Sequence, residues 1–477
     1  MSPSRTPSAS RPVGGGRRPA LGSGPRAKCG ACTQRRPERR TSPERRRNGP
    51  KARNGPEAVN DAETVNDAAH AAGNGVPLSP NRSRKPTVAP YSARVHRREP
   101  RILIDATAVP ADRGGVGRYV DSLLAALDAD GARLAVACQP RDARLYSTIA
   151  PHSEVVPAAE SVATRTARLA WEQTTLPRLI RRLGIDVLHS PHYTTPLANP
   201  AASVVTLHDA TFFTDPALHS PVKARFFRAW TRTALRRATL CVVPSDATAS
   251  ELARTVGADR GAIQVMYHGV DPERFHPPSP AEVRAVRDRL GLFDQPYIAF
   301  LGALEPRKNV PSLIRGFTMA CQGRSDPPTL VLAGQPGWDT SVERALEAVP
   351  HRIRVIRAGY LPFGELAGFL GGAQVVAYPS IGEGFGLPVL EAMACGAAVL
   401  TTRRLALPEV GGDAVAYCGV GAGDIAAALT ELFDDSARRS ALAAAAQRRA
   451  KEFTWAACAA QHRDAYARAD HVHRHRR

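Results

Sequence analysis

The chain has 477 residues, which is enough for two or three domains with large buried cores. Its formal net charge of +20 suggests an anionic partner such as nucleic acid. However, residues 1–100 hold 21 Lys and Arg against 7 Asp and Glu, so +14 of this charge belongs to the first 100 residues and +6 to the other 377. The charge distribution therefore argues against nucleic-acid binding by the rest of the chain.

Residues 1–100 are rich in Arg, Pro, Gly, Ser and Asn and contain almost no large apolar side chains. Such a segment buries too little surface to offset its ordering entropy, so we predict a disordered basic tail. Three explanations of the tail stay open: a solvated segment without specific function, a tether to an anionic surface such as lipid headgroups or nucleic acid, and upstream sequence translated from a wrongly assigned start.

Cysteine usage indicates the compartment. The eight cysteines are scattered, and Cys29 and Cys32 form a lone Cys-x-x-Cys without the second pair that a zinc site needs. Thiols within apolar runs fit a reducing environment. No uninterrupted apolar stretch approaches the roughly 18–20 residues that span a bilayer. We therefore predict a cytoplasmic protein.

Regular structure is predicted to begin at residues 101–105, a short apolar strand. A loop containing Gly114, Gly115 and Val116 follows and leads into a helix with apolar residues at helical spacing. A glycine loop between the first strand and first helix of a Rossmann-like unit usually faces a ligand. This loop lacks the full Gly-x-Gly-x-x-Gly spacing, so it does not predict a dinucleotide, and a tight turn explains it equally well.

The rest of the first half alternates apolar runs with helical patterns, which predicts a parallel sheet covered by helices. The predicted strands are residues 134–138, 186–189, 204–208, 240–244 and 263–268. His208 ends one of them, at the carboxyl edge where open α/β sheets bind ligands; a structural histidine is the alternative. Residues 223–237 form a basic helix with aromatic side chains, which could lie on an anionic membrane or dock on its own sheet.

Prolines between residues 272 and 280 mark a linker, and a second series of strands follows it. These predicted strands are residues 297–302, 329–333, 354–358, 374–378, 398–401 and 415–417. Arg307 and Lys308 follow the first of them, just before Asn309, a predicted helix N-cap. An Arg fork and a Lys point charge are what a metal-free enzyme needs to hold a diphosphate, although a solvated basic turn has the same composition.

The stretch from Ser380 to Glu391 joins the fourth of these strands to a helix predicted at residues 387–395. Its glycines let a ligand approach the backbone, and the helix N-terminus favours negative charge. Glu383 is expected in the loop, and Glu391 about one turn into the helix. Taken alone, these residues also fit an ordinary turn with two solvated carboxylates.

Two glutamates separated by seven residues around Gly-Phe-Gly-Leu-Pro resemble the signature of retaining glycosyltransferases with the GT-B fold, most closely family 4, the group 1 proteins. The resemblance extends over residues 101–469, with the motifs in the expected order. It implies an α/β fold of two Rossmann-like domains with parallel sheets facing a central cleft. The implied parts are the basic tail (1–100), an acceptor-side domain (101–272), a linker (273–295), a nucleotide-sugar-binding domain (296–452), and a helix that crosses back and then frays (453–477).

The resemblance also implies roles for the motif residues. Glu383 contacts the hydroxyls of the donor sugar, and Glu391 contacts the ribose. Arg307 and Lys308 hold the diphosphate, and His208 faces the donor sugar from the N-terminal domain, so His208, Glu383, Arg307 and Lys308 are the implied catalytic residues. The donor-binding loop presents backbone N–H groups to phosphate and sugar, and the first glycine loop borders the cleft. These loop residues are Gly384, Phe385, Gly386 and Leu387, and Gly114, Gly115 and Val116.

The implied activity is retaining transfer, by front-face attack, from a nucleoside diphosphate sugar to a glycan or lipid-linked acceptor in cell-envelope polysaccharide or glycolipid synthesis. Residues 305–309 and the Ala-Trp-Glu-Gln stretch at 170–173 resemble a mannosyltransferase-rich branch, which favours GDP-mannose over UDP-sugars. For the second stretch, a helix anchored by a buried Trp171 is the other explanation. Ala303 stands where many family members have Arg, which leaves Arg307 and Lys308 as the phosphate ligands.

No cofactor and no metal site is predicted. Asp128-Ala129-Asp130 matches an Asp-x-Asp string, but it closes a predicted helix, so we expect a solvated helix end. The implied location is the cytoplasm or the inner face of the plasma membrane, with peripheral contact through residues 223–237. Two other functions compete: a non-catalytic GT-B partner protein, and binding of nucleic acid or an anionic surface through the basic tail. No specific nucleic acid is expected.

Overall fold

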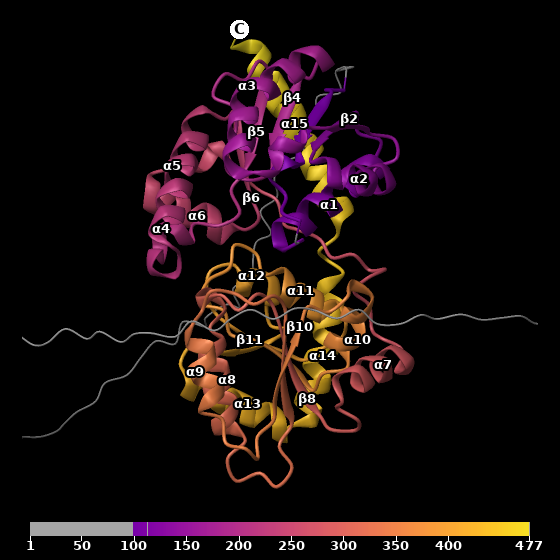
Figure 1. The fold of residues 1–477 in the computed structure, drawn as a ribbon, viewed down its shortest axis with the longest axis vertical. Coiled ribbons are helices and arrows are strands. Elements are labelled where there is room, and N and C mark those ends of the chain that lie inside the picture. The colour runs from indigo at the N-terminus through magenta and orange to yellow at the C-terminus, as the bar shows by residue number, and fades with distance from the viewer. Residues whose placement is uncertain (1–98, 112, 477) are drawn as a thin grey trace, which may run out of the picture. The chain divides into compact units, whose positions relative to one another are not determined.

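The computed structural model describes residues 99–111 and 113–476. The predicted basic tail therefore lies outside the described residues, except for Glu99 and Pro100. The described chain forms two parallel sheets, each covered by helices on both faces (Figure 1). The predicted α/β class with two Rossmann-like units is confirmed.

The first sheet has seven strands within the described ranges, all parallel. In sheet order they are β3 (Glu154–Pro157), β2 (Leu134–Cys138), β1 (Ile102–Asp105), β4 (Val187–Ser190), β5 (Ala202–Thr206), β6 (Leu240–Val243) and β7 (Ile263–Val265). The strand order reverses between β1 and β4, which makes this pair the topological switch point of the sheet.

The second sheet repeats this order with six strands, again counted over the described residues. They are β10 (Val355–Gly359), β9 (Thr329–Ala333), β8 (Tyr297–Leu301), β11 (Val375–Tyr378), β12 (Val399–Thr402) and β13 (Ala416–Cys418). The switch point here lies between β8 and β11. In each sheet, the loops after the two strands at the switch point therefore border a crevice at the carboxyl edge.

Helices connect the strands. Those around the first sheet are α1 (Gly115–Ala129), α2 (Ala143–Ile149), α3 (Arg165–Leu183), α4 (Thr211–Thr214), α5 (Pro221–Arg237) and α6 (Asp246–Val256). Those that follow are α7 (Pro280–Leu290), α8 (Val310–Ala320), α9 (Ser341–Glu347), α10 (Leu366–Gly371), α11 (Leu387–Ala394), α12 (Leu407–Gly411), α13 (Ala422–Asp434), α14 (Ser436–Ala450) and α15 (Trp455–His475). None of the helices in the described part of the chain is long and apolar enough to cross a membrane.

Both faces of the central strands are buried, which is why these strands are mostly apolar in the sequence, whereas the edge strands β3 and β10 are partly exposed. In β1, Ile102 and Ile104 pack in the core shared with α1 and α15, whereas Leu103 packs in the core shared with α3. Val205 and Val243 extend the second of these faces, in a core with residues of α4 and α6. Apart from its edge strands, the first sheet is therefore a buried central layer.

Helix α15 returns to the first sheet, where Cys458 and Tyr466 are buried in the core with α1. The crossing is tight at Gly269, because a Cβ there would lie 2.1 Å from the backbone nitrogen of Trp455. Only glycine allows this approach without movement of the backbone. The helix continues to His475, through residues that the sequence predicted to fray.

Three strands differ from the prediction by two residues or more. One is β5, predicted at residues 204–208 but found at Ala202–Thr206, so His208 lies two residues beyond its end. The edge strand β3 was not predicted, because its sequence Glu-Val-Val-Pro has two apolar residues and its ends are exposed. The predicted strand at 263–268 ends at Val265. Beyond it the chain turns toward Gly269, where it meets α15.

Candidate functional site

Loops that follow strands of both sheets, β1, β5, β8 and β11 among them, meet around a cavity of about 350 Å³. Ligands of open α/β sheets bind outside the carboxyl ends of strands at the switch point, and the β1, β8 and β11 loops arise there. The cavity is lined by the following predicted site residues: Gly114, Gly115, Val116, His208, Arg307, Lys308, Glu383, Gly384, Phe385, Gly386 and Leu387. Glu391 is not among the lining residues.

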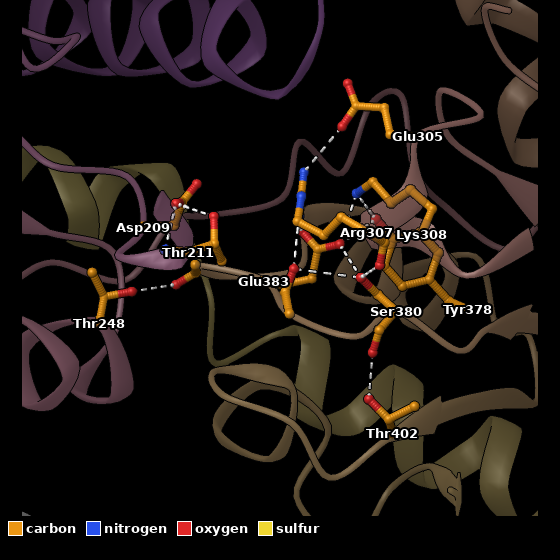
Figure 2. Close-up of polar contacts among 12 residues, drawn as sticks. Asp209, Thr211, Thr248, Glu305, Arg307, Lys308, Tyr378, Ser380, Glu383 and Thr402 are labelled. Atoms are coloured by element: carbon orange, nitrogen blue, oxygen red, sulfur yellow. Dashed lines mark hydrogen bonds and ion pairs between the residues drawn. The ribbon is translucent and has the colours of Figure 1, made fainter. Parts of the chain in front are cut away.

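Glu383 is the centre of the polar contacts on the second sheet's side of the cavity (Figure 2). Its Oε1 accepts hydrogen bonds from Lys308 Nζ at 2.7 Å and from Ser380 Oγ at 2.6 Å. The Tyr378 hydroxyl donates to the same oxygen at 3.0 Å, and Oε2 forms an ion pair with Arg307. Tyr378 ends β11 and Ser380 follows it, whereas Arg307 and Lys308 lie in the loop after β8, so the pairing of these two strands brings the partners together.

These contacts change the pKa of each charged group. Burial acts to raise the pKa of Glu383, but Arg307 and Lys308 outweigh it and lower the value to about 2. Burial and the neighbouring Arg307 lower the pKa of Lys308 to about 8, against the opposing effect of Glu383. Burial also acts to lower the pKa of Arg307, but Glu383 holds it above its usual value. At neutral pH all three groups are charged.

The charges that line the cavity nearly balance. The cations are Arg113, Arg118, Arg307 and Lys308, and the carboxylates are Asp209, Glu305 and Glu383. Glu305 lies 3.7 Å from Arg307 and shares it with Glu383. Two of these cations lie on the side of each sheet, and carboxylates already orient their side chains. A dianion that enters the cavity would therefore meet oriented positive charge from both sides.

Asn309 ties the β8 loop to the β11 loop. It is the N-cap residue of α8, as predicted, but its φ is 59° and its side chain makes no cap hydrogen bond. Its amide instead donates to the carbonyls of Pro379, at 3.2 Å, and Val420, at 2.9 Å. Asparagine is one of the few residues besides glycine that adopt this left-handed conformation readily.

The loop after β11 touches the first sheet at Gly384. A Cβ on this residue would lie 1.7 Å from the backbone oxygen of His208. The hydroxyls of Ser245 and Thr248 donate to the Gly384 carbonyl at 2.7 and 3.2 Å, and Figure 2 shows Thr248 at this contact. Gly386, two residues on, has a φ of 99° at the start of α11. Close approach at one position and a left-handed φ at the other require both glycines.

Glu409 of α12 makes a second contact that sequence reasoning missed. Its carboxylate accepts hydrogen bonds from the backbone N–H groups of Asp246 at 2.8 Å and Ala247 at 2.6 Å. The Tyr267 hydroxyl donates to it at 3.1 Å. A carboxylate at the start of α6 satisfies free N–H groups and complements the helix dipole. The partners are more than 140 residues from Glu409, so no local pattern indicated the contact.

His208 is oriented by the loop that follows β4. Its Nε2 lies 2.7 Å from the carbonyl of Pro191. Because a carbonyl only accepts, Nε2 carries the proton, and the neutral ring keeps Nδ1 as an acceptor. Burial lowers the pKa of His208, and it lowers that of the neighbouring His192 to about 3 and that of His268 well below the ordinary value. This wall of the cavity therefore carries neutral imidazoles at neutral pH.

Glu391 is buried on α11 and engaged by a residue that the sequence analysis did not single out. Nη1 of Arg118, on α1, lies 2.6 and 2.8 Å from its two oxygens. Burial raises the pKa of Glu391, and Arg118 opposes this only in part. Arg118 itself lines the cavity. The sequence feature that could have indicated Arg118 as a site residue is its position directly after the glycine loop at 114–117. The ribose-binding role of Glu391 stays a prediction.

The Asp-x-Asp string has a structural role, and the prediction of a solvated helix end is wrong for Asp128. This residue is 5% exposed. Its Oδ1 accepts hydrogen bonds from the backbone N–H of His152 at 3.1 Å and the hydroxyl of Ser153 at 2.6 Å, which fixes the turn before β3. Within residues 99–111 and 113–476, no group of three or more His, Cys, Asp and Glu side chains is arranged to hold a metal ion.

Comparison with known proteins matches two family models to the chain. The model described as Glycosyltransferase Family 4 covers residues 113–274, and that described as Glycosyl transferases group 1 covers residues 284–449. The O-antigen chain mannosyltransferase B of Escherichia coli is 32% identical over 375 residues, which are 74% of this chain and 95% of that protein. The D-inositol 3-phosphate glycosyltransferase of Xylanimonas cellulosilytica is 36% identical over 240 residues, 46% of this chain and 55% of that protein.

Solved structures resemble the fold at low sequence identity. The crystal structure of Anabaena Alr3699/HepE in complex with UDP and glucose matches with a TM-score of 0.62 at 17% identity, over 77% of this chain and 99% of that one. At this identity the likeness concerns the arrangement of the two sheets and their helices.

Proposed function

Because this chain belongs to the family 4, group 1 glycosyltransferases, we propose that it transfers a hexose, with mannose favoured, from a nucleoside diphosphate sugar to a hydroxyl of a glycan or lipid-linked acceptor. The observation that carries this proposal is the Glu383 carboxylate, held by Arg307 and Lys308 at the wall of a cavity between the loops of two switch points. The setting of the reaction would be the synthesis of cell-envelope polysaccharide or glycolipid.

Arg307 and Lys308 are assigned to the diphosphate. Its departure concentrates negative charge on the leaving phosphate, and preorganised donors stabilise such charge most where water is excluded. Helix α11 adds the positive end of its dipole and the N–H of Leu387, whereas Pro388 has no N–H and the N–H of Val389 already donates to the Gly386 carbonyl. Together these groups supply the stabilisation that a bound metal gives other transferases, so we propose that transfer continues in the presence of EDTA.

Glu383 and His208 are assigned to the sugar. With a pKa of about 2, Glu383 stays ionised at neutral pH and accepts hydrogen bonds from the donor sugar's hydroxyls. His208 offers the acceptor nitrogen Nδ1 from the opposite wall. In the proposed retaining step, the acceptor oxygen bonds to the anomeric carbon on the face that the phosphate leaves. The acceptor proton passes to the departing phosphate oxygen.

The donor is tested by calorimetry and thermal unfolding of the full chain with GDP, UDP, ADP and dTDP, with and without EDTA. We expect GDP to bind and to raise the free energy of unfolding by about 2.7 kcal/mol at a hundredfold excess over its Kd. GDP-mannose is then the expected substrate. The exposed Lys451→Ala variant should keep this stabilisation, and Lys308→Ala should lose most of it. If none of the nucleotides stabilises a folded sample, the non-catalytic partner function gains support instead.

We propose peripheral contact of α5 with the inner face of the plasma membrane as the place of action. Residues 216–245 contain no Asp or Glu. Arg225, Arg228 and Arg232 line a groove of about 610 Å³ beside α5, and the nearby Val222 is 82% exposed. A basic face beside an exposed apolar residue suits an anionic bilayer.

Vesicle sedimentation tests this contact. The chain should sediment with vesicles containing phosphatidylglycerol and not with phosphatidylcholine vesicles, and added salt should release it. Arg225→Glu with Arg232→Glu should abolish sedimentation and leave the melting temperature unchanged, because both side chains are exposed. Because the basic tail could act in the same way, a variant lacking residues 1–98 is the control. Equal sedimentation of the double variant would contradict contact through α5.

A further inference from the structure

The Ala-Trp-Glu-Gln stretch of α3 contains Glu172, the buried centre of a polar cluster. Glu172 has no exposed surface, and its Oε2 lies 2.9 Å from Nη1 of Arg168, one turn earlier. The hydroxyl of Thr194 donates to the same oxygen at 2.5 Å, and Gln173 Nε2 donates to Oε1 at 2.9 Å. Trp171 is only partly buried, so the explanation of a helix anchored by a buried Trp does not account for this stretch. A buried ion pair of this kind contributes little net stability, which points to a role in orientation.

This cluster forms hydrogen bonds to the loop that follows β4. Arg168 Nη2 donates to Thr194 Oγ1 at 3.1 Å. The side-chain amide of Gln173 donates to the Thr195 carbonyl at 3.2 Å and accepts the backbone N–H of Leu197 at 3.0 Å. The loop is thus held at three positions by two neighbouring residues of α3 and Arg168.

On its other side, the same loop forms hydrogen bonds to His208 and Asp209. The Pro191 carbonyl accepts a hydrogen bond from the Nε2–H of His208. The hydroxyl of Tyr193 accepts the backbone N–H of Asp209 at 3.0 Å and lies 3.3 Å from the Asp209 carbonyl. Tyr193 is 2% exposed and has a φ of 57°, a conformation that a residue other than glycine adopts only when its surroundings impose it.

We infer that Arg168, Glu172, Gln173 and Tyr193 are positioning residues, which fix the ring orientation and the Nε2–H tautomer of His208 through the loop at 191–197. The inference rests on the proposed function in so far as His208 faces the donor sugar. It explains why a charged pair is buried far from the phosphate ligands: the cluster holds the one hydrogen bond that leaves Nδ1 of His208 free to accept.

Tyr193→Phe tests the inference, because it removes one hydroxyl and keeps the ring in the core. We expect kcat of transfer to fall about tenfold through misorientation of the sugar contact, with the KM for the donor within twofold. In selectively ¹⁵N-labelled protein without substrate, the His208 signals should shift away from the pure Nε2–H tautomer. A His208→Asn variant identifies those signals. Glu172→Gln should change kcat and the spectrum in the same direction.

Tyr466→Phe is the matched control. Tyr466 lies on α15 and is also fully buried against the first sheet, and its hydroxyl bonds to His189 Nδ1 of β4 at 2.8 Å, not to the loop at 191–197. A merely structural role of Tyr193 would lower the melting temperature in both variants alike and leave the His208 spectrum unchanged. Unchanged kcat in Tyr193→Phe overturns the inference, whatever the spectrum shows. Failure of the wild type to transfer any sugar would overturn the proposed function, whereas the spectrum would still test the positioning of His208.

Discussion

Replacement of Lys308 by Ala is expected to lower kcat/KM for sugar transfer by about 10²–10³-fold, the effect of removing one preorganised donor to developing charge. The fold should survive, because Glu383 keeps Arg307, Tyr378 and Ser380 as partners. No buried carboxylate is left unpaired, so the large destabilisation that follows the breaking of a buried ion pair does not arise. Initial rates with a saturating acceptor, beside a melting curve, measure the two effects separately.

The pKa of Lys308 gives this prediction a second test. Because that pKa is about 8, the protonated side chain is present below pH 8 and is lost as the pH rises through this value. The kcat/KM of the wild type, which reports on the free enzyme, should fall over the same range. Lys308→Arg should remove the fall, since an Arg side chain stays charged. A wild-type profile that is flat from pH 7 to 10, or an unchanged rate in Lys308→Ala, would contradict the role of Lys308 at the phosphate.

The residues that could be predicted are those whose role depends on local spacing. The central strands are buried on both faces, so they are mostly apolar runs, and their alternation with helices predicts parallel sheets. Arg307 and Lys308 lie in the loop after β8 and Glu383 in the loop after β11, and loops at carboxyl edges converge in this fold. Their meeting at one carboxylate therefore follows from the strand order.

What could not be predicted depends on partners far away in the chain. Arg118 and Glu391 are 273 residues apart, and neither has a neighbour in sequence that indicates the other. From the sequence alone, Glu172 also fits a solvated helix face. Only the fold places Thr194 against it. Asn309 stands at the N-cap of α8, but only the fold shows that its side-chain nitrogen donates to the carbonyls of Pro379 and Val420. In each case a tertiary contact decides between two local explanations.

Replacement of Gly384 by Ala is expected to lower transfer by about 100-fold, the cost of misplacing the reacting groups by about 1 Å. The added methyl group would lie 1.7 Å from the His208 carbonyl oxygen and 3.1 Å from Cβ of Asp209. Because the nearer atom belongs to the backbone, a side-chain rotation cannot relieve the contact. The loop must move away from the first sheet, and its carbonyl then loses the hydroxyls of Ser245 and Thr248.

Such a movement would separate Glu383 from His208, the two residues assigned to opposite sides of the donor sugar. Gly384 is buried and its neighbour Phe385 belongs to the core of the second sheet, so the melting temperature should fall while transfer is lost. Gly364→Ala is the matched control, since a Cβ there meets no atom within 4 Å. It should transfer sugar at the wild-type rate. If Gly384→Ala does the same, contact between the loop and His208 is not needed for catalysis, and the assignment of both residues to one sugar fails with it.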